Sequence, residues 1–262
     1  MTDVPSSAVR ATRAPSVSRI LTALLEADIT VQIRNVRALG LTLFLPLLLI
    51  YVTFITKRRG VLLGGPAAEV AIALTLGVAS LAILGYTNTV ARDREKGVFQ
   101  RLRVTPAQGW QIITSRLVVQ VLAMIVMAVW VLVVGTLLLK IDSSVAGWVL
   151  TILCVVPGSA VFLAVGQALV ALIPSADTLN AVGRLAYLPL LVLGVFAHIP
   201  TFGTTFETVA RWSPGGVVID LFASALQPST WSGDTWGSLA ACLGYAVVFT
   251  AIGIRWFRWT SQ

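Results

Sequence analysis

The stretch TVARDREKGVFQRLRVTP, residues 89–106, separates two long apolar segments of this sequence. Residues 92–103 carry seven charges in twelve positions, whereas only 11% of the whole chain is charged. The flanking segments, 70–91 and 117–139, contain no Asp, Glu, Lys or Arg. This arrangement is typical of a polar loop between two helices that each cross a bilayer with about 20 apolar residues.

The composition of the whole chain also indicates a membrane protein. Hydrophobic residues make up 57% of it and the mean hydropathy is +0.89, whereas soluble domains usually carry about 25% charged residues. Backbone polar groups inside hydrocarbon must be paired within the protein, and the alternation typical of a membrane β-barrel is absent. We therefore predict an all-α membrane protein with six transmembrane helices. The charge-free runs are 38–56, 70–91, 117–139, 143–176, 185–206 and 235–254.

The distribution of basic residues predicts the orientation of these helices. With both termini inside, 14 Lys and Arg residues fall on the cytoplasmic side and five on the outer side, as the positive-inside rule requires. The outer cluster Lys57-Arg58-Arg59 is a local exception. The net charge of +8 is thereby assigned to orientation and to contact with membrane lipids, and we expect no nucleic-acid partner.

The segments outside the spans have their own patterns. Residues 1–15 read as a disordered cytoplasmic tail, and 16–262 as one transmembrane domain. Residues 16–37 place Arg19, Glu26, Thr30, Arg34 and Arg37 on one face, which predicts an amphipathic helix in the headgroup plane; a cytoplasmic extension of the first span is the alternative. The spans are expected near 39–56, 68–91, 105–139, 145–173, 179–198 and 236–256.

The apolar segment between the last two spans is expected to form two short helices, 203–212 and 214–226. Ser213 would cap the second helix, and Pro214 would occupy its first position. Both helices are too short to cross the membrane, so we expect re-entrant outer helices that dip into the outer leaflet where protein covers their backbone.

The charged loop also contains an apolar ridge. Val98, Phe99 and Leu102 share one face of a predicted short helix, and Gly97 separates this helix from the charges that precede it. Such a ridge suits docking of a cytoplasmic protein, and a positive-inside anchor without a partner is the alternative.

The run EKGVFQRLRVTP, residues 95–106, resembles the conserved loop of ABC-2-type permeases, the membrane subunits of ATP-binding-cassette exporters. Trp212-Ser213-Pro214 followed by Asp220 is similar to a late segment of the same family, and the order of elements matches along nearly the whole chain. The resemblance implies that residues 92–103 form a coupling helix on a separate cytoplasmic nucleotide-binding ATPase subunit, which would bind ATP and Mg. It also implies a homodimer, or a heterodimer with a paralogous permease. The coupling residues would be Arg94, Glu95, Gly97, Val98, Phe99, Gln100, Arg101, Leu102 and Arg103.

The resemblance further implies a substrate pathway built from the second and fifth spans, although packing and interhelical hydrogen bonds are the commoner roles of such residues. The run RNVRALGLTLFLPLLL, residues 34–49, resembles drug-efflux members of the bacterial inner membrane. It implies multidrug efflux and antibiotic resistance, with a hydrophobic or amphipathic drug or lipid as substrate. A polysaccharide or glycolipid exporter and a non-transporting anchor or assembly protein remain alternatives. The pathway candidates are Thr75, Ser80, Tyr86, Asn88, Tyr187 and Phe196.

The chain shows no catalytic machinery of its own. None of its three lysines follows a glycine, as the G-x-x-x-x-G-K-[ST] phosphate loop would require. Its ionisable Glu69, Arg116 and Arg184 fall near span ends, where side chains can reach the interface. With one histidine and two cysteines in apolar runs, no metal site and no cofactor in this chain are predicted. Transport energy would then come from the partner subunit.

Overall fold

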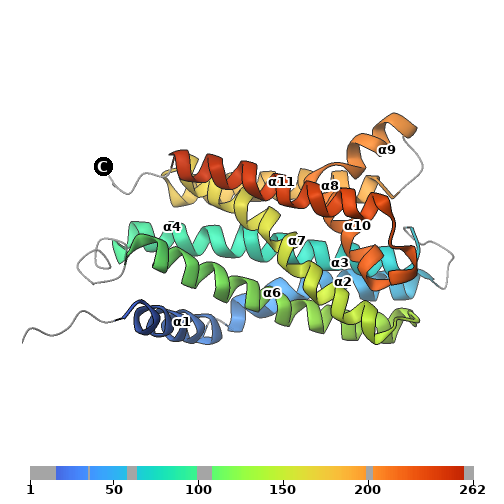
Figure 1. The fold of residues 1–262 in the computed structure, drawn as a ribbon, viewed down its shortest axis with the longest axis horizontal. Coiled ribbons are helices and arrows are strands. Elements are labelled where there is room, and N and C mark those ends of the chain that lie inside the picture. The colour runs from blue at the N-terminus through green and yellow to red at the C-terminus, as the bar shows by residue number, and fades with distance from the viewer. Residues whose placement is uncertain (1–15, 35, 58–63, 99–107, 199–202, 257–262) are drawn as a thin grey trace, which may run out of the picture.

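The computed structural model describes residues 16–34, 36–57, 64–98, 108–198 and 203–256. Within these ranges all regular secondary structure is helical (Figure 1). The predicted tail 1–15 and the cluster residues Arg58 and Arg59 lie outside them. The elements are α1 Val17–Arg34, α2 Val36–Lys57, α3 Pro66–Ala79, the π-helix η1 Ser80–Tyr86, α4 Thr87–Glu95, α6 Gly109–Leu139, α7 Val145–Leu172, α8 Ala176–Phe196, α9 Thr204–Arg211, α10 Pro214–Leu226, the 3-10 helix η2 Pro228–Thr230 and α11 Gly233–Trp256.

Five of the described helical segments are long and apolar enough to cross a membrane. α3, η1 and α4 run on as one 30-residue segment, Pro66–Glu95, and the other four are α6, α7, α8 and α11. The first expected span corresponds to α2, whose apolar part, Phe44–Thr56, is shorter. The all-α membrane architecture is therefore confirmed, with five spans by this measure.

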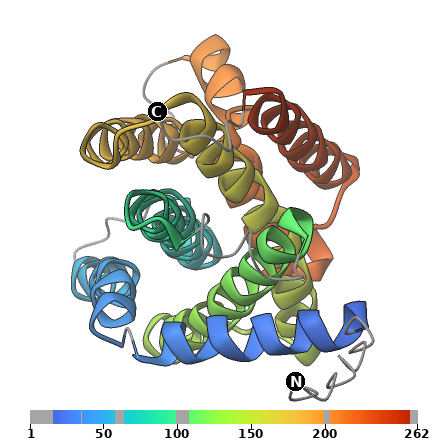
Figure 2. The same ribbon diagram turned by 90° about the vertical axis from the view of Figure 1, so that its left-hand side faces the viewer.

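The N-terminal helix α1 lies across the others. The long helices run roughly along the horizontal axis of Figure 1, whereas Figure 2, viewed along that axis, shows α1 from the side. Its half-buried positions include Ile20, Leu21, Leu24 and Leu25, and the helix packs on α6. α1 thus lies across the long helices with its apolar side turned partly toward the protein, and its predicted place in the headgroup plane stays a prediction.

The centre of the bundle is α3, which packs against α2, α6, α7, α8 and α10. Its small side chains, such as Ala71 and Ala79, are fully buried, so neighbouring backbones can approach closely. Glu69 in its first turn is only 2% exposed. The expectation that this carboxylate reaches the interface freely is therefore wrong, because the end of a central helix is covered by its neighbours.

The two short helices after α8 form where the sequence predicted them. The hydroxyl of Ser213 accepts a hydrogen bond from the Gly216 N–H at 3.1 Å, and Pro214 opens α10. α10 packs among α3, α7, α8 and α11. Its Val217, Ile219 and Phe222 are fully buried. Although short, α10 is therefore part of the core at the end of the bundle opposite α1 (Figure 1).

Glycines allow α10 to lie this close to its neighbours. A Cβ on Gly215 would stand 2.1 Å from the carbonyl oxygen of Leu190, and one on Gly194 would stand 2.7 Å from the carbonyl carbon of Gly215. A side chain at either position would separate α8 from α10.

We expect Gly215→Ala to destabilise the protein by about 1–3 kcal/mol, as overpacking does in well-packed cores. The thermal midpoint in detergent should fall by roughly 2–4 °C per kcal/mol. Gly244→Ala is the matched control, since a Cβ there meets nothing within 4 Å, and alanine favours a helix over glycine. Equal midpoints for the two variants would contradict this packing.

Candidate functional site

The predicted coupling helix 92–103 begins inside α4, because residues 92–95 form the last turn of that helix. α4 ends at Glu95, and Gly97 has a φ of +66°, a left-handed conformation that glycine adopts at little cost after a helix. The predicted break at Gly97 is confirmed. Val98 is half-buried. The coupling candidates Phe99, Gln100, Arg101, Leu102 and Arg103 lie outside the described residues.

Arg94 turns from the base of this loop toward the end of α7. Its guanidinium donates hydrogen bonds to the carbonyl oxygens of Val170 at 3.1 Å, Ile173 at 2.7 Å and Pro174 at 2.5 Å. The last carbonyls of a helix lack intrahelical partners, and they carry the negative end of the helix dipole. A planar cation with several donors is therefore well suited to this position.

Glu95 contacts the start of the next helix. Its Oε1 accepts a hydrogen bond from the backbone N–H of Ala176 at 3.1 Å, the first residue of α8. A carboxylate is favoured there because the N-terminus of a helix carries positive partial charge. Arg94 and Glu95 thus hold both helix ends of one short turn, and we call this pair with residues 170–176 the α7–α8 clamp.

Two further polar contacts tie the same end of the bundle together. Arg116 on α6 forms an ion pair with Asp93 at 2.7 Å. The Ser115 hydroxyl donates to Asp28 Oδ2 on α1 at 2.7 Å. α6 itself starts in a capping box, in which the Gln108 N–H donates to the side chain of Gln111 at 2.8 Å. The base of the charged loop is therefore joined directly to α6, α7 and α8, and through α6 to α1.

Most of the pathway candidates lie inside the bundle. The hydroxyls of Thr75 and Ser80 donate to backbone carbonyls of their own helix at 2.8 and 2.9 Å, and that of Tyr187 donates to Leu76 at 3.2 Å. All three residues are buried. They reach a substrate only if helices separate, so their role in a pathway stays a prediction.

The remaining candidates also have internal partners. Tyr86 is buried and its hydroxyl accepts a hydrogen bond from the Gln167 amide. The Asn88 amide donates to the Leu84 carbonyl at 2.5 Å. The Phe196 ring meets that of Phe206 edge-on, with centroids 6.2 Å apart. Ser80 and Tyr86 delimit the π-helix η1, a wider form of helix that is rare and occurs frequently at functional sites.

The opposite end of the bundle contains a second charged cluster, centred on the predicted Asp220. Arg211 contacts the Asp220 carboxylate at 2.8 Å and that of Asp234 at 3.2 Å, and the hydrogen bond to Asp220 raises the pKa of Arg211. This cluster joins α9, α10 and α11. Nearby, burial lowers the pKa of His198, with the charge of Asp220 acting in the opposite direction.

The described residues hold no group of three or more His, Cys, Asp and Glu that could bind a metal ion. Cys154 and Cys242 are buried free thiols. Around the base of the loop, charged side chains of α4 contact three other helices.

Comparison with known proteins shows the family of this membrane protein. The architecture is that of a multi-pass membrane protein with a charged loop anchored to its helices. The model of the ABC-2 family transporter proteins matches residues 66–255, which is more than half of the chain. The chain therefore belongs to the ABC-2 family: it is the membrane domain of an ATP-binding-cassette transporter and works with an ATP-binding subunit. No curated protein matches the sequence.

Sequence reasoning selected Arg94 and Glu95 as coupling residues but missed their contacts within the chain. The sequence did contain a local signal. A basic and an acidic residue at the end of one helix can bind the C-terminus of one neighbouring helix and the N-terminus of the next. It also missed Asp28, because the expected polar face of α1 did not include that residue.

We expect Arg94→Ala to cost about 1–3 kcal/mol, because it leaves carbonyls at a half-buried turn without a donor. Thermal unfolding in detergent measures the loss. Arg92→Ala removes the same charge two residues earlier from an exposed side chain and should change the midpoint little. If both variants unfolded at the wild-type midpoint, the α7–α8 clamp would not contribute to stability.

Acidification should weaken the end of the bundle opposite the charged loop through His198. In the folded protein the pKa of His198 lies below the ordinary 6.5. The neutral imidazole therefore stabilises the folded state above that pH, and this stabilisation is lost as the pH falls through the folded pKa. We expect the thermal midpoint to drop between about pH 7.5 and about pH 5.5 more in the wild type than in His198→Asn. Since this is the single histidine of the chain, parallel pH curves would rule out its contribution.

Proposed function

We propose that this chain is one half of an ATP-driven exporter that moves a hydrophobic or amphipathic substrate, a drug or a lipid, out of a bacterial cell. The observation that carries this proposal is the connection of the charged loop to α7 and α8 by Arg94 and Glu95. A force on the loop passes to two spanning helices through charged hydrogen bonds rather than being absorbed by a flexible connection.

The work would come from the ATPase subunit, on which ATP and Mg would bind. Its closure would press on the loop, and the conformation that binds it best would become more populated. Phe99 and Leu102, with Val98, are the proposed apolar contact. Arg101 and Arg103 at its edge would fit acidic groups on the partner.

The proposed topology has six spans, with α2 as the first and both termini in the cytoplasm of the inner membrane. The charge distribution supports it. α1 would lie in the inner headgroup layer and α9 on the outer side. α10 would be re-entrant, a role supported by its position among four other helices and by the burial of most of its residues.

A second permease subunit, identical or paralogous, would complete the pathway. α8 exposes Leu185, Leu188 and Val192, and α2 exposes Phe44 and Tyr51. Both helices pack on α3, so these apolar surfaces belong to neighbouring parts of the bundle. The inward-facing Thr75 and Tyr187 would meet substrate only when such an assembly opens.

Phe99→Ala combined with Leu102→Ala should weaken binding to the cognate ATPase at least about tenfold, because truncating two apolar anchors at an interface costs about 2 kcal/mol or more. Copurification and drug-stimulated ATP hydrolysis in proteoliposomes measure the effect. Leu137→Ala is the matched control, since Leu137 is exposed near the far end of α6.

Unchanged copurification and stimulation in the double variant would contradict the coupling role of the loop. Stimulation by glycolipids and not by drugs would instead favour the polysaccharide or glycolipid exporter. A complex that hydrolyses ATP without moving any substrate would favour an anchor or assembly protein.

A further inference from the structure

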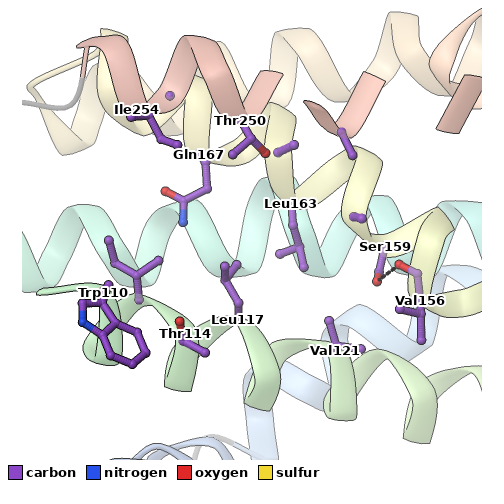
Figure 3. A pocket seen from close by; sticks show the side chains of 15 residues that line it. Trp110, Thr114, Leu117, Val121, Val156, Ser159, Leu163, Gln167, Thr250 and Ile254 are labelled. Carbon is purple, nitrogen blue, oxygen red and sulfur yellow. Dashed lines mark hydrogen bonds between the residues drawn. The ribbon is translucent and has the colours of Figure 1, made fainter. Parts of the chain in front are cut away.

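A lateral cavity of about 530 Å³ lies between α6, α7 and α11 (Figure 3). α6 and α11 both pack on α7 and have little contact with each other. Small residues, Ala160 and Ala164 on α7 with Ala246 and Gly253 on α11, line the space. Its size is within the range of about 300–1,000 Å³ that is usual for small-molecule sites.

The cavity opens to the apolar outer surface of the bundle. Of its lining residues, Trp110, Val156 and Ile254 are 51%, 48% and 76% exposed. Beside it, α11 exposes Val247 and Leu243, as helices do when they face lipid. A ligand would therefore enter from the bilayer and not from water.

The side chains that line the cavity are mostly apolar at one end and more polar toward the other. Figure 3 shows Val121 and Val156 at one end, where the Ser159 hydroxyl is bonded to the Val156 carbonyl, and Trp110, Gln167 and Thr250 toward the other. The polar end is the end of the bundle that carries the charged loop, since Trp110 stands in the first turn of α6.

The polar end offers groups that could bind a ligand. Among the described residues no hydrogen bond engages the hydroxyls of Thr114 and Thr250, whereas threonines such as Thr136 and Thr151 bond to a carbonyl of their own helix. The Gln167 amide nitrogen donates to Tyr86, and its oxygen has no such bond within the described ranges.

We propose that this cavity binds one acyl chain of a membrane phospholipid from the leaflet on the side of the charged loop. The chain would lie against Val121, Val156 and Leu163, and the two ester carbonyls of the lipid would accept hydrogen bonds from Thr114 and Thr250. The phosphate would face Arg255, in the last turn of α11 directly after Ile254. Trp110 and Trp256 would flank the headgroup, where indole rings are favoured, and an arginine at this level attracts anionic lipid.

The bound lipid would be a permanent component of the permease and not the substrate that the proposed exporter moves. It would fill the space between two spans that scarcely touch. Through Gln167 it would also contact Tyr86 at the end of η1. The proposal can be tested without the ATPase, so its failure and that of the proposed function are separable.

The test uses the full-length permease in nanodiscs of phosphatidylethanolamine and phosphatidylglycerol, with a trace of phosphatidylglycerol that carries a photoactivatable group in its acyl chain. We expect labelling of α6, α7 and α11 at the cavity. Native mass spectrometry should show one lipid that survives detergent extraction. Ala246→Phe should lower its retention about tenfold, the loss expected when roughly two methylenes no longer fit.

Val247→Phe is the matched control, because it adds an aromatic ring to the next, outward-facing position of α11. Thr114→Val with Thr250→Val keeps the shape and removes the hydroxyls, so it should weaken retention even if Ala246→Phe unfolds the protein. Labelling spread evenly over the outer surface, or equal retention in all variants, would overturn the proposal. Displacement of the lipid by a drug-like amphiphile under transport conditions would also overturn it and mark the cavity as a cargo site.

Discussion

This structure depends on the hydrogen bonds that Arg94 and Glu95 form with the turn between α7 and α8. One side chain serves the carbonyl end of α7 and its neighbour serves the N–H end of α8. Opposite charges thereby meet the opposite ends of two helix dipoles. Because the turn is short, two adjacent residues of a single helix can reach both ends at once, and the position of α4 determines that of two further spans.

The far end of the bundle is held differently. There, α10 is inserted among four helices and packs through glycine contacts and buried aliphatic side chains. The ion pair between Arg211 and Asp220 ties the same region to α9. With charged hydrogen bonds at one end, and close packing together with an ion pair at the other, the helices near α3 are held at both ends. Under the proposed function, such a bundle would move as one body when the ATPase subunit pressed on the loop.

The pathway candidates illustrate how far a sequence can be interpreted. Thr75, Ser80 and Tyr187 attract attention as polar residues in apolar helices. A hydroxyl in such a helix usually finds a backbone carbonyl, either in its own turn or in the next helix, and each of these does so. Sequence alone could not distinguish that outcome from a pore lining, because the distinction depends on which helix face meets which neighbour.

The sequence by itself determined the helical membrane architecture, the family, the charged loop with its break at Gly97, and the α9–α10 pair with the Ser213 cap. These features depend on hydropathy and on hydrogen bonds between residues a few positions apart. Both can be predicted from the order of neighbouring residues in the sequence. Only the tertiary structure decided that Arg94 reaches Ile173, that Asp28 meets Ser115 and that a cavity separates α6 from α11. Those contacts join residues distant in the chain, and their existence depends on how whole helices cross.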